Sequence, residues 1–90
     1  MTKALISVTG LDTTGIIAGV SSKLSEMNIN ILEITQTILD GYFTMMMVVD
    51  LDGSLLSFDE IDKQLQPVRD SMKMSIHIQR MDIFDAMHRI

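Results

Sequence analysis

Two stretches with the pattern of β-strands are joined by the dipeptide Asp40-Gly41, and this junction restricts the possible folds more than any other feature. Asp-Gly between strand-like runs is a strong signal for a two-residue hairpin turn, because both residues accept positive φ. The stretches Ile31–Leu39 and Tyr42–Asp50 are therefore predicted to pair as antiparallel neighbours. The alternation of the second stretch predicts its core-facing residues: Phe43, Met45, Met47 and Val49.

A first amphipathic helix is predicted before this hairpin, over about Thr14–Met27. The Asp and Thr residues of the preceding loop can cap it. Its apolar stripe follows steps of three and four: Ile17, Val20, Leu24 and Met27.

A second helix is predicted after the hairpin, where Ser57 and Glu60 form a capping box. Pro67 lies inside its apolar stripe, so we expect the helix to kink or end near Gln66. The stripe again follows steps of three and four: Phe58, Ile61, Leu65, Val68 and Met72.

Strand-like alternation over Lys3–Thr9 and Lys73–Met81 completes the order β-α-β-β-α-β. Two helices can cover only one face of four strands, and right-handed crossovers then favour a ferredoxin-like arrangement. The predicted fold is an α+β two-layer sandwich with an antiparallel sheet of order 4-1-3-2. Residues 1–81 are expected to form this single domain, with a short C-terminal extension over residues 82–90.

The other face of the sheet is predicted to be mixed and partly apolar, and so to need a cover. One candidate cover is the apolar tail at 82–90, packing on the domain or on a partner subunit; the other is a second subunit's sheet. The tail's apolar residues are spaced as in a helix: Ile83, Phe84, Met87 and Ile90. The residues assigned to the face are Leu5, Ser7, Thr35, Thr37, Tyr42, Thr44, Met46, Val48, Ser75 and His77.

Composition excludes several classes of function. The chain of 90 residues has a net charge of −5 and no run of Lys or Arg, so no nucleic-acid partner is expected. It contains no cysteine and no apolar run of the roughly 20 residues that span a bilayer, so neither a disulfide nor a membrane partner is expected. The first residues read as a strand and not as a signal peptide, which predicts a cytoplasmic protein. So small a core favours a homodimer or a higher homo-oligomer.

The stretch "TGLDTTGI", Thr9 to Ile16, is the best candidate for a binding site. It lies at a strand-to-helix junction, where free amides and the helix dipole favour a carboxylate. Asp12 could accept hydrogen bonds from a ligand ammonium group. The glycine spacing matches neither a P-loop nor a dinucleotide fingerprint. A capped turn without a ligand remains the alternative.

Nothing in the sequence predicts catalysis, a cofactor or a metal site. No Ser-His-Asp arrangement stands out, and His77 and His88 have no partner at a ligand-like spacing.

The segment "VTGLDTTGIIAGVSSKLSEMNINILEI", with Thr35-Gln36-Thr37, "YFTMM" and the end "IFDAMHRI", resembles small stand-alone ACT domain proteins. Those are similar to the ACT domains of glycine-cleavage-system transcriptional repressors. The resemblance covers about Thr2 to Met81 and implies a βαββαβ regulatory module that commonly binds amino acids at a dimer interface.

The resemblance also implies where a ligand would bind: Gly10, Leu11, Asp12, Thr13, Thr14, Gly15 and Ile16 in one subunit, with Asn30 and Ile31 opening the second strand. Side-chain contacts fall to Asp12 and Asn30, and Gly15 lets the loop turn. The sequence departs from the family pattern at Gly10, where amino-acid-binding members carry a polar side chain, and at Asp12, where the serine-binding type has Asn. Asn30 could instead bond only turn backbone.

Two functions therefore stay open. The first is a non-catalytic regulatory module that binds an amino acid or a similar small metabolite. The second is a dimerisation or protein-interaction module without a small-molecule ligand.

Overall fold

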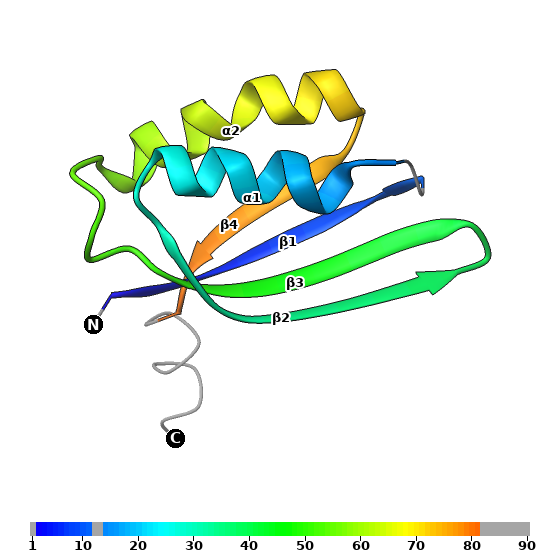
Figure 1. The fold of residues 1–90 in the computed structure, drawn as a ribbon, viewed down its shortest axis with the longest axis horizontal. Helices are drawn as coiled ribbons and strands as arrows, with labels where there is room; N and C mark the ends of the chain where they lie inside the picture. Colours follow the sequence, from blue (N-terminus) through cyan, green and yellow to red (C-terminus); the bar gives the residue numbers. More distant parts are fainter. Residues whose placement is uncertain (1, 12–13, 82–90) are drawn as a thin grey trace.

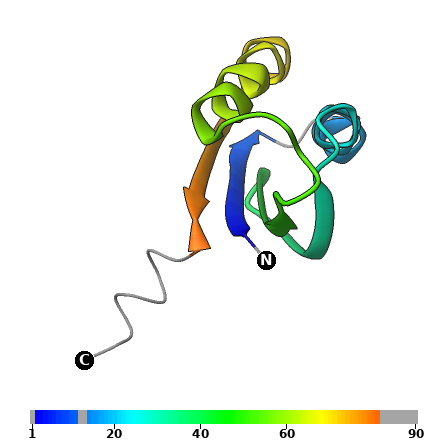
Figure 2. The same ribbon diagram turned by 90° about the vertical axis from the view of Figure 1, so that its left-hand side faces the viewer.

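The computed structural model describes residues 2–11 and 14–81, so the predicted tail at 82–90 lies outside the described part. The strands form one antiparallel sheet of order β2-β3-β1-β4, which confirms the predicted order 4-1-3-2. Both helices lie on the same side of this sheet (Figures 1 and 2). The elements are β1 (Lys3–Leu11), α1 (Ile16–Glu26), β2 (Asn30–Leu39), β3 (Tyr42–Asp50), α2 (Phe58–Met72) and β4 (Ser75–Arg80).

Strand β3 supplies the centre of the core, as its alternation predicts. Phe43, Met45, Met47 and Val49 are buried, while Tyr42, Thr44 and Met46 between them are exposed. The buried set faces the helices together with alternate residues of β1, namely Ala4, Ile6 and Val8.

Helix α1 begins two residues later than predicted, at Ile16. Its N-cap is Gly15 at φ 86°, a left-handed conformation that glycine adopts without a Cβ clash, and no side chain among the described residues caps it. The prediction that Ile17 faces the core is wrong, because Ile16 is only 3% exposed and Ile17 is 39% exposed. A start at Ile16 places Ile16, Val20 and Leu24 at four-residue steps on the side that faces the sheet.

Helix α2 begins with the predicted capping box. The Ser57 hydroxyl accepts a hydrogen bond from the Glu60 amide at 3.2 Å, and a Glu60 carboxylate oxygen accepts one from the Ser57 amide at 2.9 Å. These two bonds satisfy two of the amides that a helix start leaves without an intrahelical partner.

Of the two predicted effects of Pro67, a kink or an end near Gln66, the end is wrong, because the helix continues through Pro67 to Met72. Pro67 is exposed, so water can reach the carbonyl that loses its amide partner. Arg69 connects this part of α2 to β4 through side-chain hydrogen bonds. Its guanidinium donates to the Asp62 carbonyl at 3.0 Å and to the Asp62 carboxylate at 2.6 Å, and Nε donates to the Ile76 carbonyl of β4 at 2.8 Å.

Strand β2 forms an edge of the sheet, and the helices leave much of it uncovered. A bulge between Ile31 and Glu33 sets Leu32 outside the regular pairing with β3. On the helix side, Ile34 and Ile38 remain 44% and 58% exposed. The hairpin end of β2 and β3 extends beyond α1 in Figure 1. Within residues 2–11 and 14–81, no helix combines the length and the apolar character that a bilayer crossing requires.

Replacing the cap residue by Ser57→Ala should destabilise the protein by about 1 kcal/mol, because the Glu60 amide loses its acceptor. Urea unfolding followed by circular dichroism measures the change. Ser71→Ala, at an exposed position of the same helix, is the matched control and should leave stability unchanged or slightly higher. Equal stability of Ser57→Ala and Ser71→Ala would contradict the assigned cap.

The capping box should also make stability depend on pH. The Ser57 amide, as the largest cause, holds the pKa of Glu60 below its ordinary value of 4.5. A lowered pKa in the folded state means that the carboxylate stabilises the fold above its unfolded pKa, and that this stabilisation is lost as the pH falls through the lowered value. Glu60→Gln should therefore lower the Tm more at neutral pH than below about pH 3. If the Tm difference between Glu60→Gln and the wild type does not change with pH, this assignment is wrong.

Candidate functional site

The loop between β1 and α1 leads into a helix start that no side chain within residues 2–11 and 14–81 caps. The Gly19 amide donates to the Gly15 carbonyl at 2.9 Å, which completes the first turn. The amides of residues 16–18 precede any intrahelical acceptor, and no acidic residue lies in this turn. With the positive end of the helix dipole, they can hold an anion such as a carboxylate.

Two methionines near the turn from α2 to β4 pack against the glycines at the site. The sulfur of Met74 occupies the space that a Cβ on Gly10 would take, and the Lys73 carbonyl oxygen lies 3.6 Å from the same position. The sulfur of Met72 lies 3.0 Å from the position of a Cβ on Gly19. A Cβ on Gly10 would therefore require the Met74 side chain to move. Met72 was predicted only as part of the apolar stripe of α2, and the packing of both methionines on these glycines was not predicted, because they are distant from the glycines in sequence.

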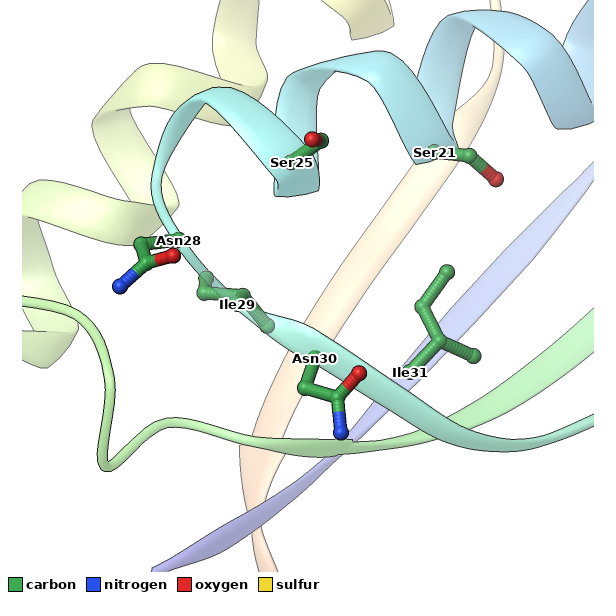
Figure 3. A pocket seen from close by; sticks show the side chains of 6 residues that line it. All are labelled: Ser21, Ser25, Asn28, Ile29, Asn30 and Ile31. Carbon is green, nitrogen blue, oxygen red and sulfur yellow. The ribbon is translucent and has the colours of Figure 1, made fainter.

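A second recess lies at the opposite end of α1, where β2 begins. This pocket of about 390 Å³ is lined by Ser21, Ser25, Asn28, Ile29, Asn30 and Ile31 (Figure 3). The Ile31 side chain points toward α1, and the Asn30 side chain points to the other side of the strand (Figure 3). Asn28, at φ 58°, donates from Nδ2 to the Gly53 carbonyl at 2.7 Å and so ties this turn to the loop after β3. The two serines were not predicted, although their four-residue spacing places them on one side of the helix.

The predicted site residues fall into two groups at opposite ends of the molecule. Helix α1 has 11 residues, or about 16 Å of length, between the loop and Asn30. In the sheet, Leu11 lies opposite Tyr42 and Asn30 lies opposite Asp50. These rows are eight residue steps apart along β3, about 26 Å. One chain therefore does not bring both groups to one small molecule.

The first group comprises Gly10, Leu11, Thr14, Gly15 and Ile16, of which Ile16 is buried and Gly10 is half-buried. The second comprises the exposed Asn30 and the half-buried Ile31. Asp12 and Thr13, which the sequence places in the first group, lie outside the described residues. In the part of the chain that is described, no three His, Asp or Glu residues gather in a way that could hold a metal ion.

Comparison with known proteins adds close relatives of the same length. A UPF0237 protein of Listeria monocytogenes is 49% identical over 88 residues, which cover 98% of this chain and 99% of the relative. The solved structure of an ACT domain protein from Streptococcus pneumoniae is 42% identical, with a TM-score of 0.82, and covers 92% of this chain and 93% of its own.

Two more distant structures share the fold. The regulatory subunit of aspartate kinase from Thermus thermophilus is 25% identical, with a TM-score of 0.68, over 87% of this chain and 50% of its own. A protein assigned as a glycine cleavage system transcriptional repressor is 19% identical, with a TM-score of 0.76, over 88% of this chain and 45% of its own.

The family model for the ACT domain matches residues 2–79, nearly the whole of the described fold. This match confirms the predicted resemblance, and the chain belongs to the ACT domain family.

Proposed function

We propose that the protein is a non-catalytic regulatory module that binds an amino acid, or a similar small metabolite with a carboxylate and an ammonium group, between two copies of the chain. The observation that carries the proposal is the division of the site into two groups. A helix start that no described side chain caps lies at one end of α1, and Asn30 lies at the other. Two copies are needed to bring such groups together.

The chemistry of each group suits one part of such a ligand. The amides at the start of α1 bind the ligand carboxylate, because they point at an anion and the helix dipole favours it. Asp12 accepts hydrogen bonds from the ammonium group, and the Asn30 amide of the second copy can both donate and accept. Gly15 lets the backbone approach the ligand closely.

The free edge of β2 is suited to join the two copies. When two β2 strands pair antiparallel around a two-fold axis, the start of each strand lies beside the end of the other. Asn30 of one copy then lies at the end of the sheet where the second copy carries its β1–α1 loop. The same pairing shields the exposed Ile34 and Ile38, which would otherwise leave an apolar edge open to aggregation.

The regulatory part of the proposal draws on the family. The regulatory subunit of aspartate kinase carries the same fold, and so does the protein assigned as a repressor of the glycine cleavage system. By analogy, the response of this domain to a ligand would pass to a partner.

A second candidate is an interaction module whose β1–α1 loop holds no ligand. The exposed apolar side chains of β2 favour it, since they would be buried on dimerisation whether or not a small molecule binds.

A thermal-shift screen with the twenty amino acids tests the ligand. We expect one amino acid or a small group of them to raise the Tm, because a ligand that binds only the folded state adds about 2.7 kcal/mol at a hundredfold excess over Kd. Asp12→Ala or Asn30→Ala should abolish the shift. Asp59→Ala, an exposed carboxylate at the start of α2, should retain it. A stable dimer that no amino acid shifts would favour the module without a ligand.

Mixing two inactive variants tests whether each site draws on both copies. In heterodimers of Asp12→Ala with Asn30→Ala, one of the two sites contains both wild-type residues. An equimolar mixture should therefore regain about a quarter of the binding sites, measured by calorimetry after joint refolding. A mixture that binds no more than the separate variants would show that Asp12 and Asn30 act within one chain, or that one of them is not at the site.

A further inference from the structure

The face of the sheet that points away from the helices is built from aligned rows, and we call it the open face. One row joins Leu11, Tyr42 and Leu39 across β1, β3 and β2. The next joins Ser75, Thr9, Thr44 and Thr37, and the one after it joins His77, Ser7, Met46 and Thr35. The predicted assignment of residues to this face agrees with the register and with the alternating burial of β3.

Three rows of the open face, those nearest the Asp40-Gly41 turn, combine apolar exposure with an absence of charge, whereas the charged residues of this face, Lys3, Glu33 and Asp50, lie toward its other end. Leu11 is 63% exposed, Leu39 75%, Tyr42 55% and Met46 44%. These three rows contain no carboxylate, ammonium or guanidinium group, although the whole chain carries a net charge of −5. An acidic protein approaches a second copy of itself at the lowest electrostatic cost where its surface is uncharged.

We propose that the open face packs against the open face of a second copy, sheet against sheet. This contact is separate from the β2 edge, which pairs two copies at the proposed ligand site. A chain that uses both contacts assembles into four copies. Two sheets that pack face to face interdigitate their side chains at an angle of about 30° between strand directions. The polar groups of the three rows are hydroxyls and one imidazole, which can pair with one another, as the Ser75 hydroxyl and His77 Nε2 already do at 3.0 Å.

The tail at 82–90 is the other possible cover, but it is too short for the most exposed row. Its apolar residues have helical spacing, and nine residues of helix measure about 14 Å. Strand β4 ends at Arg80, opposite Ala4. The row that contains Leu11 lies seven residue steps beyond Ala4, about 23 Å away. A helical tail docked from Arg80 could cover Leu5, Val48 and the row of Ser7 and Met46, about 10 Å away, and would leave Leu11, Tyr42 and Leu39 exposed.

Two matched substitutions separate the two contacts. Met46 and Ile34 are both 44% exposed, on adjacent strands, but Met46 belongs to the open face and Ile34 to the helix side of the β2 edge. We expect the wild type to sediment as four copies, each of Met46→Lys and Ile34→Lys as two, and the double variant as one. Analytical ultracentrifugation gives the masses, and circular dichroism checks that each variant is folded. If Met46→Lys fails to fold, Thr44→Lys places the same charge on the same face.

The other outcomes decide the question as well. If the wild type is a dimer and Met46→Lys has the same mass, the open-face contact is overturned. If Ile34→Lys also converts that dimer to monomers, the proposal of a ligand site between two copies still stands. If the wild type is a dimer that Met46→Lys dissociates and Ile34→Lys does not, the open-face contact is supported. The proposal of a ligand site between two copies is then overturned. The tail would be the cover if deletion of residues 82–90 raises the mass of the assembly and Met46→Lys in the full chain leaves that mass unchanged. This result overturns the proposal.

Discussion

The pairing of β3 with β1 on one side and β2 on the other determines the positions of all the other features. Its register sets Lys3 opposite Asp50 and Leu11 opposite Tyr42, so β1 and β3 run past each other over their full lengths. The core-facing side chains of both strands then form a continuous apolar surface for the helices to cover. The same register places the start of α1 and the start of β2 at opposite ends of the sheet. The division of the site is thus a consequence of strand pairing and not of loop conformation.

The regular parts of this fold could be predicted because their signals are local. The Asp40-Gly41 turn, the alternation of β3 and the capping box of Ser57 and Glu60 each depend on residues close in sequence. The start of α1 was less predictable. Ile16 and Ile17 are both apolar, and only the left-handed Gly15 decides which of them faces the core. The continuation of α2 past Pro67 was also less predictable, because the segment after Pro67 is joined to β4 by the bond from Arg69 to the Ile76 carbonyl, which no local pattern shows.

Only those parts of the candidate site that depend on residues close in sequence could be predicted. The loop with glycines before α1 and the Asn that opens β2 can be read from the sequence, and the structure describes both except for Asp12 and Thr13. Their separation could not be read, because it depends on the length of α1 and the register of the sheet. The pocket beside Asn30 also depends on a contact distant in sequence, the bond from Asn28 to the Gly53 carbonyl. A Cβ on Gly53 would lie 3.0 Å from the Asn28 carbonyl oxygen, so this glycine is needed for the close approach.

Two methionines fill the irregular space beside the glycines on either side of the β1–α1 loop. Gly15 leaves the backbone free to approach a ligand, but glycine also has the largest conformational entropy to lose on folding. Met74 fills the space beside Gly10, and the Met72 methyl group lies 4.0 Å from the position of a Cβ on Gly15. An unbranched thioether side chain adapts to such irregular gaps better than a branched one. Packing beside Gly10 and Gly15 therefore comes from residues at the end of α2 and in the turn before β4, which lie far from both glycines in the sequence.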